Sequence, residues 1–167
     1  MNTRIHGVNV AAHIEMVLAT ERGQVGNEDG YNRFPQLKVL VRSASQRRHG
    51  CAWPHRYGRE NSRVHLLLNE VPGHDAYDTI ETVCHEMAHL LAPRGAHHSA
   101  AWRNVYRMLA HQAYGIVLPP TFSRFIGVLA PTLRVRAAQG TLGHVGSRLI
   151  FPTKTLALSH SVLMVVA

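Results

Sequence analysis

The stretch that most constrains this chain is His85-Glu86-Met87-Ala88-His89, an H-E-x-x-H pattern. Residues four positions apart lie on one face of a helix, so both imidazoles can reach a single cation. Glu86 is offset around the helix, close enough to act on a water beside the metal without binding the metal itself. The pattern can also arise by chance, because the chain holds 13 histidines in 167 residues. In a helical context it predicts a zinc hydrolase helix.

The flanking residues favour a helix over residues 76–92. Apolar side chains repeat there at helical spacing and form a face that excludes both histidines. They are Ile80, Cys84, Met87 and Leu91. Asp75 is a suitable N-cap, and Pro93 and Gly95 end the pattern. The motif is therefore expected on a buried, well-capped helix.

The composition indicates one globular domain with a real core, because 46% of the residues are hydrophobic. The first ten residues lack the apolar stretch of a signal peptide, and no apolar run is long enough to span a membrane. The two cysteines, Cys51 and Cys84, do not form a disulfide framework or a zinc ribbon, and they suggest a reducing compartment. We expect a cytoplasmic protein without a membrane partner, and its oligomeric state is not predicted.

The charge is unevenly distributed along the chain. Residues 1–86 carry 10 basic and 10 acidic side chains, whereas residues 87–167 carry 8 basic ones and no acidic one. Residues 42–63 contain six arginines together with Trp53 and Tyr57, a combination that suits phosphate contact and base stacking. Non-specific nucleic-acid binding is therefore one possible activity, and a solvated basic surface is the alternative.

The order of the expected elements indicates an α+β fold. Before the motif we expect a helix over residues 8–20, a strand over 37–43, a short strand at 50–53 within a loop, and a strand over 64–68. After the motif we expect a helix between Ser99, its possible cap, and Gly115, with Trp102 on its apolar face. Beyond it the pattern suggests a short helix over 122–130 and strands at 133–135, 149–151 and 155–167.

A catalytic zinc normally has three protein ligands, so a third ligand is needed. No Asp or Glu follows Glu86, which excludes a downstream carboxylate. The downstream histidines are His97, His98, His111, His144 and His160. We favour His98, which opens the next helix across a short loop, and His97 is the remaining alternative. Trp102 would then pack beneath the site.

With His98-Ser99-Ala100-Ala101-Trp102 after the motif helix, residues 37–113 resemble the core of SprT-like zinc metallopeptidases, which are small zincins. The resemblance implies a zincin-like core, a small sheet packed on the H-E-x-x-H helix and a following helix. It implies a metallopeptidase domain over residues 1–115, followed by a basic extension over 116–167. The zinc ribbon common in that family is missing, since only two cysteines are present.

By this resemblance, Zn²⁺ is held by His85, His89 and His98, and Glu86 is the general base that takes a proton from the attacking water. The substrate is a protein or peptide, which would add as a strand to an edge strand, with 64–68 as the candidate. Tyr106, Arg103 and His97 are candidates for stabilising the oxyanion, and Glu81 and Asp78 could support a ligand histidine or be ordinary helix charges.

Two other functions compete with peptidase activity. The zincin core could serve recruitment or repair in a DNA-associated protein instead of proteolysis. The zinc could also serve only to hold the fold, in which case no coordination position would be open.

Overall fold

The computed structural model of the protein describes residues 4–21, 38–43, 49–53, 65–93, 95–120, 128–140, 143–145, 148–150 and 164–166. Within them the fold is α+β, as the sequence predicts. The helices are α1 (Val10–Leu18), α3 (Ala76–Leu91), α4 (Ala100–Tyr114) and α5 (Leu129–Ala138). The strands are β1 (Arg4–Ile5), β2 (Val8–Asn9), β3 (Lys38–Ser43), β4 (Gly50–Trp53), β5 (His65–Glu70), β6 (Gly143–Val145), β7 (Arg148–Ile150) and β8 (Met164–Val166).

Four of these strands form a mixed sheet in the order β4-β5-β3-β8. β3 runs parallel to β5 and β8, whereas β4 runs antiparallel to β5. Among the described strands β4 therefore lies at an edge, and β5 lies inside the sheet with both of its sides paired. The choice of residues 64–68 as the edge strand is wrong for this reason. The short strand expected at 50–53 is confirmed as β4 and occupies the edge instead.

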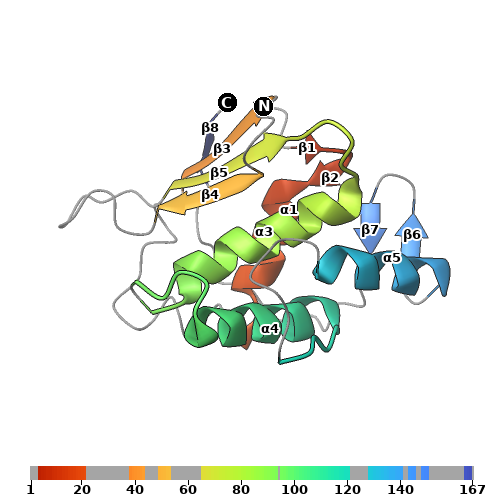
Figure 1. The fold of residues 1–167 in the computed structure, drawn as a ribbon. Coiled ribbons are helices and arrows are strands. Elements are labelled where there is room, and N and C mark those ends of the chain that lie inside the picture. The colour runs from red at the N-terminus through yellow and green to blue at the C-terminus, as the bar shows by residue number, and fades with distance from the viewer. Residues whose placement is uncertain are drawn as a thin grey trace.

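Helix α3 is the centre of the molecule, with the sheet on one side and α4 on the other (Figure 1). The Asp75 side chain accepts hydrogen bonds from Tyr77 N and Asp78 N, and the Asp78 carboxylate accepts one from Asp75 N, so the helix begins with a capping box. Twelve of its 16 residues are buried, including all four members of the predicted apolar face. A helix buried on most sides is a core element, so its polar residues need partners inside the protein.

Helix α4 follows the prediction closely. Its buried residues include Trp102, Val105, Tyr106 and Leu109, and it ends at Gly115, whose φ of 65° is left-handed. Ser99 is the N-cap residue, but its hydroxyl makes no capping bond to the helix.

The expectations for residues after 120 were partly wrong. The strand expected at 133–135 is wrong, because these residues belong to α5, which begins at Leu129. Most of the short helix expected at 122–130 lies outside the described residues, and its last two residues open α5. Pro131 falls in the first turn of α5, where no helix hydrogen bond from its nitrogen is needed. β7 overlaps the strand expected at 149–151, and β8 lies within the strand expected at 155–167.

The chain after residue 115 shares the core with the chain before it. Ile116, Leu118 and Leu129 belong to the same buried cluster as the apolar face of α3, and β8 pairs with β3. The division into a domain over 1–115 and an extension over 116–167 stays a prediction.

Candidate metal centre

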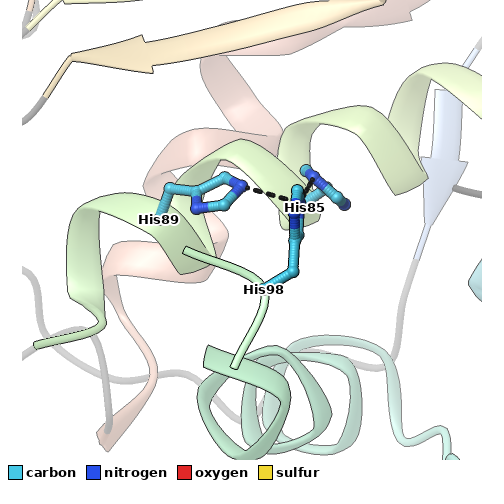
Figure 2. Close-up of side chains that lie close together, drawn as sticks. All are labelled: His85, His89 and His98. Atoms are coloured by element: carbon cyan, nitrogen blue, oxygen red, sulfur yellow. Dashed lines mark hydrogen bonds between the residues drawn. The ribbon is translucent and has the colours of Figure 1, made fainter. Parts of the chain in front are cut away.

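Three histidines meet beside α3. His85 and His89 come from neighbouring turns of α3, and His98 comes from the loop before α4 (Figure 2). The Nε2 atom of His98 lies 3.1 Å from Nε2 of His85 and 3.2 Å from Nε2 of His89. One ring nitrogen from each histidine lies within 4.8 Å of the other two. The cluster could hold a metal ion.

The spacing suits a small tetrahedral cation. Imidazole nitrogens about 2.0–2.1 Å from a tetrahedral zinc lie about 3.3–3.4 Å from one another. The two Nε2 separations in the structure, 3.1 and 3.2 Å, are close to that value. A neutral imidazole carries a proton on one nitrogen only, so three Nε2 atoms can all offer lone pairs to a shared cation when their protons sit on Nδ1. The donor set therefore fits zinc.

The protonation of the cluster also favours metal binding. Burial is the largest cause that lowers the pKa of His85 to about 3 and that of His89 to about 4, and the charges of neighbouring histidines contribute to both shifts. Both imidazoles are therefore neutral at pH 7. The neutral ring is the form that coordinates a metal, so no proton has to be removed before an ion binds.

The loop between α3 and α4 brings His98, and not His97, into the cluster. It turns through two left-handed residues, Gly95 with φ of 75° and His97 with φ of 44°. The Arg103 guanidinium donates a hydrogen bond to the His98 carbonyl at 3.2 Å, which ties the loop to the first turn of α4. His97 is exposed, whereas His98 is half-buried against α3. A left-handed conformation is costly for a residue with a side chain, so other contacts must hold this turn.

Trp102 packs beneath all three histidines, as the sequence predicts. Its ring centroid lies 4.7 Å from that of His85, 5.1 Å from that of His89 and 4.8 Å from that of His98. Tyr106 stacks on Trp102, with centroids 5.2 Å apart and an interplanar angle of 15°. Both aromatic side chains are only 1% exposed. They form a rigid apolar wall that limits the orientations available to the imidazoles.

Glu86, the predicted general base, lies on a different face of α3 from the apolar stripe. Its side chain is 5% exposed and lies against β4, at the level of Gly50. Its neighbour in sequence, His85, belongs to the cluster. The general-base role stays a prediction.

Glu81 is not an ordinary helix charge, and its support of a ligand histidine stays a prediction. Its carboxylate is 1% exposed and accepts hydrogen bonds from Tyr106 Oη at 3.2 Å, Val128 N at 3.0 Å and Ala130 N at 3.0 Å. It thus joins α3 to α4 and to the start of α5. Sequence analysis missed this role; the available signal was a carboxylate one turn before His85 on a helix that is otherwise core.

Asp78 and two of the oxyanion candidates have structural partners. Asp78 completes the capping box and forms an ion pair with Arg134 at 2.8 Å. Burial raises the pKa of Tyr106 well above its usual value, and its hydroxyl donates to Glu81. The Arg103 guanidinium donates to the His98 carbonyl. These contacts join α3 to α4 and α5, and they join α4 to the loop that carries His98.

No protein-family model, curated protein or solved structure matches this chain. Within the described residues, no helix combines the length and the apolar character needed to cross a membrane. Most of the basic stretch over residues 42–63 lies outside the described residues, so nucleic-acid binding stays a prediction. The cytoplasmic location and the peptide partner also stay predictions.

Proposed function

We propose that this protein is a zinc-dependent metallopeptidase of the SprT-like type. The observation that carries the proposal is the convergence of the Nε2 atoms of His85, His89 and His98 at 3.1–3.2 Å. Three imidazoles are a ligand set used by catalytic zinc, which keeps its fourth position for water or substrate. A fully structural zinc would normally have a fourth protein ligand.

The chemistry of such a site depends on the ion and on one carboxylate. Zinc supplies a Lewis acid that polarises a carbonyl and lowers the pKa of a water towards neutrality. Glu86 accepts the proton from the attacking water and returns it to the nitrogen of the leaving amine. Trp102 keeps solvent from the back of the three imidazoles and holds their rings in place.

The substrate in this proposal is an extended segment of protein chain. β4 and β8 are the two edge strands of the described four-stranded sheet, and β4 is the one that lies over α3 at the level of Glu86. An extended peptide can pair with an exposed strand edge through its backbone, which requires little sequence preference. The role that the sequence assigned to residues 64–68 therefore passes to β4.

The metal site is tested by zinc content. We expect about one zinc per purified wild-type chain, a loss of zinc in His98→Ala, and full zinc in His97→Ala, because the exposed neighbour is outside the cluster. The His97→Ala variant is a matched control, since it removes an imidazole from the same loop. Full zinc in His98→Ala, or no zinc in the wild type, would contradict the assignment.

The reaction is tested by Glu86→Gln, which keeps the shape of the side chain and removes its basicity. We expect zinc to be retained and hydrolysis of an unfolded protein substrate to fall by about 10²–10⁴-fold. Equal activity in Glu86→Gln would reject the general base. A wild-type protein that binds zinc and cleaves no peptide under any tested condition would make the zinc structural.

A further inference from the structure

Gly50, the first residue of β4, lies against the side chain of Glu86. A Cβ atom built on Gly50 would lie 2.7 Å from Glu86 Cγ, 3.0 Å from Glu86 Oε1 and 3.0 Å from Thr82 Cγ2. The first of these distances is shorter than a carbon–carbon contact allows, since such atoms approach best at about 3.5–4.0 Å. The edge strand can come this close to α3 only where it has no side chain.

Space, and not backbone conformation, is the reason for glycine here. Gly50 is not among the glycines with positive φ in the described residues, so its backbone is one that any residue can adopt. A glycine inside a strand normally weakens the strand, and it often marks a place where another group approaches closely. The group that approaches Gly50 is the proposed general base.

Neither side of the contact is free to move away. β4 is fixed by its antiparallel pairing of Gly50 with Leu68 and by the hydrogen bond from Asn69 N to His49 O at 2.9 Å. On α3, the Thr82 hydroxyl donates to the Asp78 carbonyl at 2.8 Å, which holds the Thr82 methyl group towards β4. Glu86 Cγ is in the middle of a buried side chain, so it cannot yield as a flexible end would.

We propose that Gly50 is a positioning residue for Glu86: the missing side chain leaves the space that sets where the Glu86 carboxylate lies. An alanine at this position would push the carboxylate aside while leaving the three histidines untouched. The catalytic consequence rests on the proposed peptidase function. The steric coupling between Gly50 and Glu86 does not, so it can be measured separately.

The coupling is tested by a double-mutant cycle read from thermal unfolding at a fixed zinc concentration. Gly50→Ala should lower the unfolding midpoint by roughly 3–10 °C in the wild-type background, because inserting a methyl group into a packed site is destabilising. The same change should cost much less in a Glu86→Ala background, where the two contacts with Glu86 are gone and only the contact with Thr82 Cγ2 remains. In a His97→Ala background, which leaves the contact intact, the full loss should remain.

Equal losses in all three backgrounds, or no loss in the wild type, would overturn the proposal. If Gly50→Ala does not fold, the double variant Gly50→Ala/Glu86→Ala should fold, and failure of both would also overturn it. In Gly50→Ala/Thr82→Ser one of the three contacts is removed, so we expect partial recovery.

Activity gives the second measurement. Gly50→Ala should bind zinc like the wild type and lose about 10–100-fold in kcat with little change in KM, since a displacement of about 1 Å at a reacting group can cost this much. A loss of zinc together with kcat would place Gly50 in the general structure of the site and reject a role through Glu86. A wild type with no peptidase activity would end the proposed function, and the stability cycle would still decide the role of Gly50.

Discussion

Helix α3 carries two buried polar groups only one turn apart, and they are built on opposite principles. Glu81 is surrounded by donors: a tyrosine hydroxyl and two backbone N–H groups point their protons at its carboxylate. His85, in contrast, faces two other imidazoles whose ring nitrogens approach its own. The carboxylate accepts hydrogen bonds from other elements, whereas the three imidazoles bring their ring nitrogens together at a point that could hold a cation.

This difference shows how a buried polar cluster with a structural role can be distinguished from one that binds a ligand. A buried charge is tolerated when hydrogen bonds compensate it, and its residues then act as a joint between elements. A group of acceptors that converge on one point is stable only if a proton or a metal occupies that point. Position on the helix does not distinguish the two cases, because Glu81 and His85 are both nearly fully buried.

The largest effect is expected from removing the Glu81 carboxylate, which joins α3 to α4 and to α5. Glu81→Ala leaves three donors without their acceptor, so we expect the free energy of unfolding in urea to fall by roughly 4 kcal/mol. Glu70→Ala, which removes an exposed carboxylate from β5, is the control and should change little. Zinc binding by the folded fraction should persist. A variant of normal stability that had lost only its zinc would place Glu81 in the metal site and remove the contrast.

The contact between Glu81 and α5 also shows which elements the sequence could predict and which it could not. The limits of α3 follow from Asp75 and from the apolar spacing, which are local signals, and His98 follows from a short loop and from the lack of downstream carboxylates. The start of α5 depends on a hydrogen bond from Val128 N to Glu81, which lies 47 residues earlier in the chain. The sequence around residue 128 therefore gives no local signal for this helix start. Strand-like spacing of Leu133 and Val135 therefore suggested the wrong element.

The sheet shows the same limit. The existence of β4 and β5 could be predicted from local alternation and flanking turns, but their order could not. β5 is interior because β3 pairs with one side of it and β4 with the other, and both partners are distant in sequence. The close contact of Gly50 with Glu86 depends on that order, so the sequence offered no reason to connect the two residues.

Metal removal tests the other half of the comparison. If the three histidines need a cation, zinc at about 1,000 times its Kd should add about 4 kcal/mol to the free energy of unfolding, and EDTA should remove it. His98→Ala should show almost none of this zinc-dependent gain, whereas Glu81→Ala should show the full gain on a lower baseline. A wild type whose unfolding midpoint ignores both zinc and EDTA would mean that the histidines are only packed together.

His13 sharpens the comparison by showing what burial alone does to an imidazole. Burial lowers its pKa from 6.5 to about 4, although its ring lies near Tyr114 and not among the clustered histidines. Between pH 6.5 and about 4, His13 is therefore protonated in the unfolded chain and neutral in the folded chain. The free energy of unfolding should fall as pH falls through this window. His13→Gln should remove ~3 kcal/mol of that fall, measured against wild type in EDTA. Parallel pH curves for the two proteins would contradict the depressed pKa.

The smallest effect is expected where α5 is held from outside. Arg134 forms ion pairs with Asp75 at 3.0 Å and Asp78 at 2.8 Å, but 39% of the Arg134 side chain is exposed. Arg134→Ala should therefore cost less than about 1 kcal/mol in urea unfolding, and less still in high salt, because solvent screens exposed pairs. A loss as large as that of Glu81→Ala would mean that the surface, and not the buried carboxylate, secures α5. The hydrogen bonds that Glu81 accepts from α4 and from the start of α5 would then contribute little to stability, and its role in joining these elements would have to be given up.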